Sequence, residues 1–201
     1  MASVALAEVD GDWHRGWWAR ARHCPSPNFG PRPTGVVPTL AVVHSISLPP
    51  GSYGGAQVEQ FFLNQLDVSA HPYFERLTGV RVSAHFFIRR DGACIQFVSC
   101  LERAWHAGAS IWRGRSNCND FSIGIELEGI EGAGFDDAQY ARLCELLTSL
   151  VGPAGCIDVA GHEHVSNGRK GDPGCGFDWG RTVAALGWPA RCFPEGVITV
   201  T

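Results

Sequence analysis

The sequence predicts an α/β fold, a single domain in which helices flank a central mixed β-sheet. Short apolar runs at 40–43 and 123–127 are typical of buried strands. Apolar residues at helical spacing between 140 and 150 indicate an amphipathic helix, and Asp91-Gly92 is a typical hairpin turn. No internal repeat or low-complexity linker divides the 201 residues, so we expect one hydrophobic core.

The first half of the chain predicts two helices, a strand and a hairpin. In chain order these are a helix over 13–21, a strand over 40–43, a helix over 58–66, and hairpin strands over 81–89 and 93–98. The first helix rests on the spacing of Trp13, Trp17 and Trp18, and the prolines of the following Pro-Ser-Pro end it. His44 comes directly after the strand, where serine and proline replace the apolar run, so its side chain is expected to face a cleft.

The second half predicts two strands and two helices. They are a strand over 123–127, a long helix that follows Asp136 and Asp137 and reaches Leu150, a strand over 157–160, and a helix over 179–186. In the first strand, apolar residues alternate with Glu126 and Glu128, so both glutamates lie on one face. Either they belong to a functional site, or the strand is half exposed and they are solvated. Alternation does not choose between the two acids.

The segment 161–175 gathers groups that bind metals. It contains His162, His164, Lys170, Asp172 and Cys175 among small and polar residues. Nitrogen, oxygen and sulfur ligands of this kind suit zinc, although an ordinary polar surface loop has a similar composition. His44 is a further candidate ligand, whereas alone it would be a core or boundary histidine. Three protein ligands and a water are typical of catalytic zinc, while structural zinc is held by four protein ligands.

Seven blocks of sequence, between Trp17 and Trp179, carry a resemblance to a known family. They are VVHSISLPPG (42–51), AHPYF (70–74), RVSAHFFIRRDG (81–92), RAWHAG (103–108), CNDFSIGIELEG (118–129), DAQY (137–140) and GRKGDP (168–173). In these blocks the chain resembles the zinc-dependent N-acetylmuramoyl-L-alanine amidases, and most closely their cytoplasmic type, which acts in peptidoglycan recycling. The resemblance implies the fold that these amidases share with peptidoglycan-recognition proteins.

The resemblance also implies roles for five residues. It identifies His44, His162 and Asp172 as zinc ligands, and Glu126 and Lys170 as the catalytic pair. The same likeness favours the first of the two glutamates on the strand. Related amidases can use a cysteine ligand in the 161–175 segment, so His164 and Cys175 compete for the third ligand position. The Lys-Gly-Asp-Pro arrangement favours the aspartate.

The substrate that the resemblance implies is a 1,6-anhydro-N-acetylmuramyl peptide, cut between the sugar acid and L-alanine. The residues it places around this substrate are His71, Tyr73, Arg81, Trp105 and His106. Trp105 would stack on a sugar face and Arg81 would bind a carboxylate of the peptide, unless the tryptophan is core and the arginine pairs with an acid of the protein. Ser45 and Asn117 depart from the family pattern, which has Asn and Arg there, and these departures bear on the fine substrate preference.

Composition sets the expected surroundings of the protein. A formal charge of −4 gives no reason to expect nucleic acid or an anionic membrane as a partner, and no apolar run is long enough to span a membrane. The first residues include Glu8 and Asp10 and do not resemble a signal peptide, so we expect a cytoplasmic monomer. The eight cysteines contain no Cys-x-x-Cys pair, and most are expected to be reduced thiols.

The expected boundaries are a flexible lead-in over 1–12, a zinc amidase domain over 13–190 and a C-terminal tail over 191–201. Two other classes of function compete with the zinc amidase. One is a muropeptide-binding module of the same fold that lacks catalysis. The other is a cysteine hydrolase that uses Cys175 or Cys118 with a histidine.

Overall fold

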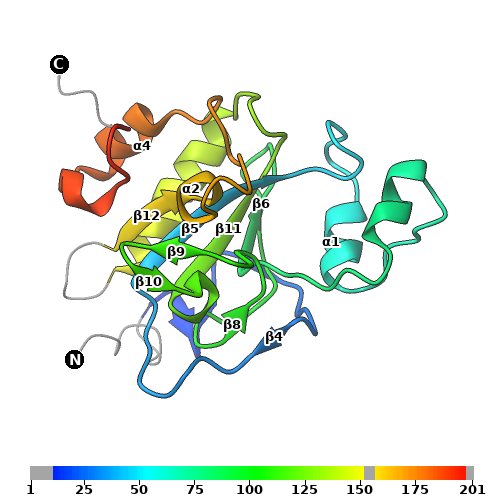
Figure 1. Cartoon of the computed structure of the whole chain (residues 1–201), viewed down its shortest axis with the longest axis horizontal. Coiled ribbons are helices and arrows are strands. Elements are labelled where there is room, and N and C mark those ends of the chain that lie inside the picture. Colours follow the sequence, from blue (N-terminus) through cyan, green and yellow to red (C-terminus); the bar gives the residue numbers. More distant parts are fainter. Residues whose placement is uncertain (1–10, 152–156, 198–201) are drawn as a thin grey trace.

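A mixed sheet of six strands lies at the centre of the computed structural model, which describes residues 11–151 and 157–197 (Figure 1). In spatial order the strands are β12 (Asp158–Gly161), β5 (Leu40–Ile46), β11 (Ser122–Glu128), β6 (Phe86–Ile88), β7 (Cys94–Gln96) and β3 (Arg22–His23). The first four run parallel, β6 and β7 form an antiparallel hairpin, and β3 runs parallel to β7. The predicted mixed sheet is therefore confirmed.

Shorter elements surround the sheet. The helices are α1 (Gln57–Phe62), α2 (Asp137–Leu150), α3 (His162–Val165) and α4 (Trp179–Leu186), and the 3₁₀ turns are η1 (Pro72–Leu77), η2 (Cys118–Asp120) and η3 (Ala190–Cys192). The two-residue strands are β1 (Trp13–His14), β2 (Trp17–Trp18), β4 (Phe29–Gly30), β8 (Arg103–Ala104), β9 (Ile111–Trp112) and β10 (Arg115–Ser116). Figure 1 shows α1 and its neighbouring 3₁₀ turn to one side of the sheet.

The two faces of the sheet have different partners. Val43 of β5 and Ile125 of β11 lie in one cluster with Leu143 and Leu147 of α2, and all four side chains are fully buried. Val42 lies on the opposite face, in a smaller cluster. Side chains alternate between the two faces along a strand, so every second residue of β5 and β11 points away from α2 to this second face. The polar side chains of these strands gather there.

The element predictions after residue 40 agree with the structure, with small changes at the ends. The hairpin strands are shorter than predicted, and α1 ends at Phe62, before the Gln65–Leu66 of the prediction. The strand that carries the two glutamates is buried along its whole length, so the half-exposed alternative is wrong.

The helix predicted over 13–21 is wrong, because this segment forms the hairpin β1–β2. Trp13 pairs with Trp18 across the hairpin, and their rings stack at a centroid distance of 6.2 Å. Arg15 and Gly16 turn the chain with φ values of 49° and 77°, the left-handed region that such turns use. A turn of this kind brings two tryptophans together as well as a helix does, so their spacing was misleading.

Residues beyond 190 contribute to the core. Cys192 and Phe193, which fall in the segment expected to be a tail, are each 2% exposed. Most of the expected lead-in, residues 1–10, lies outside the described residues, as do 198–201. Within the described ranges no helix is long and apolar enough to cross a membrane. Within these ranges the cysteines with free thiols include Cys24, Cys94, Cys100, Cys118, Cys144 and Cys175.

Candidate active site

Three adjacent parallel strands bring polar side chains to the same level of the sheet. In the register of β5 and β11, His44 lies opposite Glu126. Gly161 of β12 pairs with Val43 of β5. The next residues on these two chain segments are His162 and His44, so the two histidines lie at the same level. Paired residues of neighbouring strands point to the same face, about 5 Å apart. The two histidines and the glutamate therefore share one face, toward the carboxyl ends of the strands.

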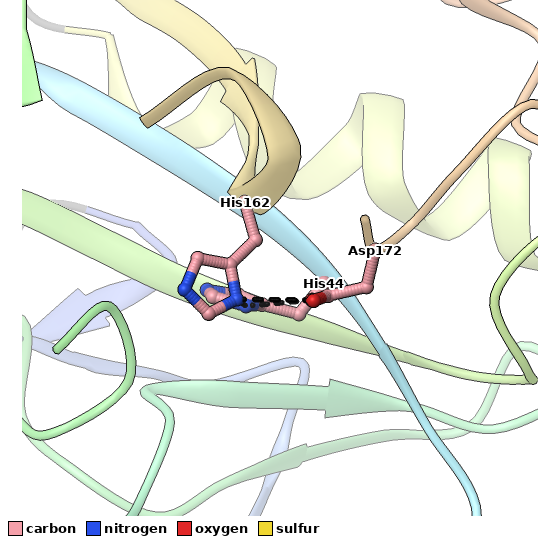
Figure 2. Close-up of side chains that lie close together, drawn as sticks. All are labelled: His44, His162 and Asp172. Carbon is pink, nitrogen blue, oxygen red and sulfur yellow. Dashed lines mark hydrogen bonds and ion pairs between the residues drawn. The ribbon is translucent and has the colours of Figure 1, made fainter. Parts of the chain in front are cut away.

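His44, His162 and Asp172 form a compact cluster (Figure 2). The Nδ1 atoms of the two histidines are 3.1 Å apart, and each is 3.1 Å from a carboxylate oxygen of Asp172. The histidines are 2% and 5% exposed, so water does not screen these groups from each other. The structure brings together the three residues that were predicted as ligands.

The hydrogen bonds around His162 indicate which atom faces the cluster. Its Nε2 lies 3.2 Å from the carbonyl oxygen of Ala107, which can only accept, so Nε2 carries the proton and Nδ1 keeps its lone pair. Burial would raise the pKa of Asp172, but contacts with His162 and His44 outweigh it and hold this pKa well below its usual range. Lone pairs and a carboxylate that converge in this way suit a cation, and two nitrogens with one oxygen are a ligand set that zinc accepts.

The loop after α3 is held in place by its own backbone. The Glu163 N–H donates to the Asp172 carbonyl at 2.9 Å. The Ser166 hydroxyl accepts from the N–H of Lys170 and donates to its carbonyl. A Cβ at Gly171 would lie 2.1 Å from a carboxylate oxygen of Glu131, so a larger residue there would displace the end of that exposed side chain. These contacts fix the loop that carries both the predicted lysine and the third ligand.

Glu126 and Glu128 have different surroundings. Glu128 accepts hydrogen bonds from the N–H groups of Gly54 and Arg90, at 2.6 and 3.0 Å. Glu126 is 9% exposed, and its Oε2 has no hydrogen-bond partner. Burial, followed by the charge of Asp172, raises the pKa of Glu126 well above its usual value. Glu126 is thus the acid that remains available to a ligand.

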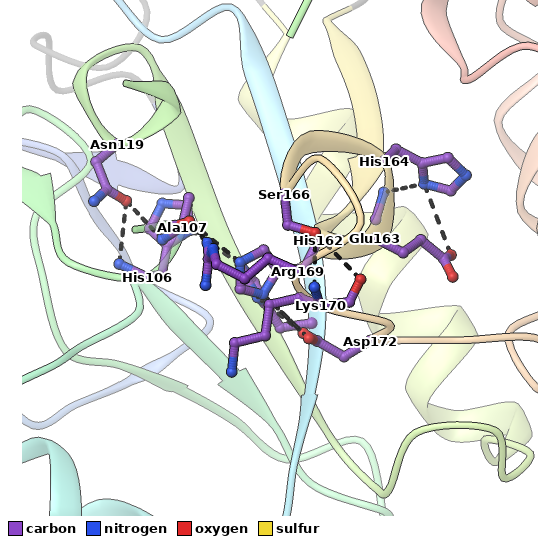
Figure 3. A network of polar contacts seen from close by, with 12 residues as sticks. His106, Ala107, Asn119, His162, Glu163, His164, Ser166, Arg169, Lys170 and Asp172 are labelled. Carbon is purple, nitrogen blue, oxygen red and sulfur yellow. Dashed lines mark hydrogen bonds and ion pairs between the residues drawn. The ribbon is translucent and has the colours of Figure 1, made fainter. Parts of the chain in front are cut away.

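A cavity of about 610 Å³ lies over the cluster. Glu126 and Lys170 line it together with the three clustered residues, and the positive charge of Lys170 counteracts the rise in the pKa of Glu126. Figure 3 shows the Lys170 side chain extending past Asp172. An acid, a cation and the cluster therefore face one space.

The predicted substrate contacts are only partly brought together. Tyr73, Arg81, Trp105 and His106 line the cavity. Both ring nitrogens of His106 already have partners within the protein, at 3.0 and 3.2 Å. His71 does not line the cavity, and its ring accepts from the Tyr73 N–H where η1 begins. Ser45 lines the cavity and Asn117 does not.

The structure adds two residues that sequence reasoning missed. Arg169 lines the cavity, and its guanidinium donates to the carbonyls of Ala107 and Ala109 at 3.0 and 2.9 Å. The buried Asn119 accepts through its side-chain oxygen from the N–H groups of His106 and Ala107 (Figure 3). Both residues lie within the blocks GRKGDP and CNDFSIGIELEG, but a backbone-bracing role leaves no recognisable sequence pattern.

The alternative ligands and nucleophiles lie elsewhere. The His164 ring accepts from the Gly161 N–H at 3.0 Å and packs edge-on against Trp179, outside the cluster. Cys175 is exposed, and it is not part of the cluster. Cys118 is fully buried, and burial raises the pKa of its thiol, which disfavours the nucleophilic thiolate.

Comparisons with known proteins agree with this geometry. The family model described as N-acetylmuramoyl-L-alanine amidase matches residues 34–175. The 1,6-anhydro-N-acetylmuramyl-L-alanine amidase AmpD of Citrobacter freundii is 49% identical over 173 residues, which cover 85% of this chain and 92% of that protein. The crystal structure of a selenomethionine AmpD derivative has a TM-score of 0.80 and 48% identity, over 85% of this chain and 96% of that chain.

A more distant structure contains a substrate. It is the N-acetylmuramyl-L-alanine amidase AmiD of E. coli in complex with anhydro-N-acetylmuramic acid-L-Ala-D-γ-Glu-L-Lys. It has a TM-score of 0.53 and 26% identity, over 77% of this chain and 60% of that chain. The chain is therefore similar in both sequence and fold to the same group of enzymes.

Proposed function

The chain belongs to the N-acetylmuramoyl-L-alanine amidase family and is an enzyme of that class, and from this premise we propose that it hydrolyses soluble 1,6-anhydro-N-acetylmuramyl peptides. The bond cut joins the lactyl carbonyl of the sugar acid to the amine of L-alanine. We place the reaction in peptidoglycan recycling, in the cytoplasm, with zinc as the cofactor and the enzyme as a monomer.

One observation carries this proposal: the cluster of His44, His162 and Asp172 lies beside an unpartnered buried glutamate in a cavity. Three protein ligands leave room for a further ligand, as catalytic zinc requires. The likeness to AmpD, whose name states the anhydromuramyl substrate, supports the choice of substrate.

The residues of the cavity would divide the chemistry among them. Zinc held by His44, His162 and Asp172 would polarise the scissile carbonyl and lower the pKa of a water molecule. Glu126 accepts the proton of the attacking water and then delivers it to the departing nitrogen of L-alanine, which leaves poorly as an anion. Lys170 donates a hydrogen bond to the oxyanion that develops on the carbonyl oxygen.

Three residues of the cavity wall are the proposed substrate contacts. Trp105 is half-buried at the cavity, where its ring would stack on the sugar. Arg81 is exposed at the cavity and would pair with a carboxylate of the peptide. Tyr73, from η1, lines the cavity as well. An anionic, sugar-bearing peptide matches these groups.

The test is to incubate the purified protein with an anhydromuramyl tripeptide and to follow products by mass spectrometry. We expect free anhydro sugar and free peptide, lost after treatment with a chelator and restored by zinc. The bound metal is measured in the same samples. Intact sacculi serve as a second substrate, and we expect them to be cut much more slowly than the soluble peptide.

Other outcomes would point to the competing classes. A zinc-loaded sample that binds the tripeptide without cutting it would indicate a binding module. Cleavage that continues in the chelator but stops after thiol alkylation would indicate a cysteine hydrolase. Equal cleavage of sacculi and soluble peptide would contradict the proposed role in recycling.

A further inference from the structure

We propose that His106 is a positioning residue for the metal centre: together with Ser122 it holds His44 as the tautomer with the proton on Nε2, so that Nδ1 offers its lone pair to the metal. This proposal rests on the zinc site of the proposed function. It gives His106 a role behind the ligand in place of the substrate contact that the family resemblance implies.

The direction of each hydrogen bond follows from a backbone carbonyl. The hydroxyl of Ser122 lies 2.6 Å from the Cys118 carbonyl oxygen, which can only accept, so the serine uses its one proton there. His106 Nε2 lies 3.2 Å from the same hydroxyl oxygen and must therefore donate to it. In a neutral ring, this leaves Nδ1 of His106 as an acceptor.

The next contact transfers this constraint to the ligand. Nδ1 of His106 lies 3.0 Å from Nε2 of His44. Since the first of these atoms accepts, His44 must carry its proton on Nε2. Nδ1 of His44 then has no proton, and this is the atom that lies 3.1 Å from Asp172 in the cluster. The tautomer that metal binding needs is thus determined by hydrogen bonds that exist without a metal.

The fit of the His106 ring shows that the chain makes room for it. A Cβ at Gly124, on the neighbouring strand β11, would lie 2.4 Å from Cγ of His106. On its other sides the ring packs edge-on against His44 and His85, at centroid distances of 5.1 and 5.8 Å. The ring is thereby kept in the one orientation that reaches both His44 and Ser122.

One buried amide braces the partners of both histidine ligands. Ala107, whose carbonyl accepts from His162, is the residue next to His106. The side-chain oxygen of Asn119 accepts from the N–H groups of His106 and Ala107, at 3.1 and 2.8 Å. Partners behind the ligands commonly change metal affinity about 10- to 100-fold when they are removed. We expect this range for the loss of the His106 acceptor.

The test compares two substitutions of similar shape, His106→Leu and His106→Asn. Asparagine places an acceptor oxygen near the position of Nδ1, whereas leucine does not, and both remove the ring. Zinc affinity is measured by competition with a chromophoric chelator. We expect His106→Leu to bind zinc about 10- to 100-fold more weakly, and His106→Asn to recover most of this loss. Equal losses in the two variants, or no loss in His106→Leu, would overturn the proposal.

A second measurement starts from the unmodified, metal-free protein, so its main result does not depend on a variant folding. Nitrogen-15 shifts of the His44 ring report directly which nitrogen carries the proton. We expect the Nε2-protonated form, and a mixture of tautomers in Ser122→Ala. A His44 ring protonated on Nδ1 in the unmodified protein would contradict the proposal. If the protein binds no zinc, the proposed function fails, while the tautomer result still tests the hydrogen-bond chain.

Discussion

Glu126 and Glu128 have the same chemistry and lie two positions apart on β11, and both are buried, yet their surroundings separate their roles. Backbone N–H groups of Gly54 and Arg90 satisfy Glu128, which therefore ties two loops to the sheet. Glu126 faces the cavity with an unpartnered oxygen and a raised pKa. Its carboxylate is more basic than an ordinary one, which suits a group that must take and return a proton.

Replacing Glu126 by glutamine is the first prediction. Glutamine keeps the size of the side chain but cannot accept the proton, so we expect kcat to fall by about 10²- to 10⁴-fold with zinc still bound. The matched control is Glu128→Gln. Its single side-chain oxygen replaces the two carboxylate oxygens that accept from Gly54 and Arg90, so one of these N–H groups loses its acceptor. This variant should retain kcat within a few-fold and reduce the free energy of unfolding by about 1–3 kcal/mol. Near-normal turnover in Glu126→Gln would refute the assignment of the base.

The second prediction concerns Lys170 and the pH dependence of turnover. Its charge lowers the pKa of Glu126, so Lys170→Met should raise that pKa further. A base with a higher pKa is protonated up to a higher pH, and the acidic limb of kcat/KM should move upward. The loss of a donor to the oxyanion should also lower kcat by about 10²- to 10³-fold. Lys170→Arg keeps the charge and should leave the limb in place. An unmoved limb in Lys170→Met would show that the two groups do not interact.

At the scale of elements, the sequence predicted local structure well where the apolar period is unambiguous. Each of three patterns is compatible with only one type of element: a strand for the apolar runs at 40–43 and 123–127, and a helix for the apolar spacing in α2. The structure has these elements. The tryptophan spacing at 13–18 is compatible with either a helix or a hairpin, because Arg15-Gly16 can form the turn of a hairpin. Local pattern alone did not exclude the helix.

Local sequence patterns also do not predict which strands lie next to each other in the sheet. Nothing in the spacing of residues says that β5 lies between β12 and β11, which is what brings His44 next to His162 and Glu126. These residues were assigned by family resemblance, and the alternation on β11 left both glutamates open. The hydrogen bond from the His106 N–H to Asn119 and the contact between the rings of His106 and His44 depend on loops that fold back onto the sheet. Only the structure shows them.

The N-terminal hairpin gives the prediction that belongs to this scale. Trp18 is fully buried, and its backbone N–H donates to the side chain of Gln96 at 2.7 Å, whereas Trp17 is half-buried beside His23. Trp18→Ala should therefore lower the free energy of unfolding by about 3–5 kcal/mol. Trp17→Ala should cost less than half as much. Urea unfolding measures both. Equal costs would contradict the hairpin, because adjacent residues of a strand point to opposite faces and only one of these two tryptophans then faces the core.

At the scale of the whole molecule, the interior contains a row of neutral histidines. His85 packs next to His106, which packs next to His44. Burial lowers the pKa of all three, and for His85 it lowers the pKa from 6.5 to about 3, with the neighbouring Arg32 as the next cause. The ring of His85 accepts from the Gly124 N–H at 2.9 Å and lies 3.1 Å from the Glu102 carbonyl oxygen. The fold therefore depends on histidines that stay unprotonated.

Acid should destabilise the protein through these residues, and His85 allows the effect to be isolated. Its folded pKa lies below its unfolded pKa, so the unfolded chain binds the proton first, and the stability present above pH 6.5 is lost as pH falls toward 3. One such group changes the free energy of unfolding by up to roughly 1.4 kcal/mol per pH unit. His85→Asn, which keeps an acceptor for Gly124, should be less stable near neutrality and lose less stability on acidification. Urea unfolding of metal-free samples at neutral pH and near pH 4 measures the difference, since loss of metal then plays no part. Parallel pH dependences in the two proteins would mean that His85 is already protonated in the fold, or that it titrates alike in the folded and unfolded chains.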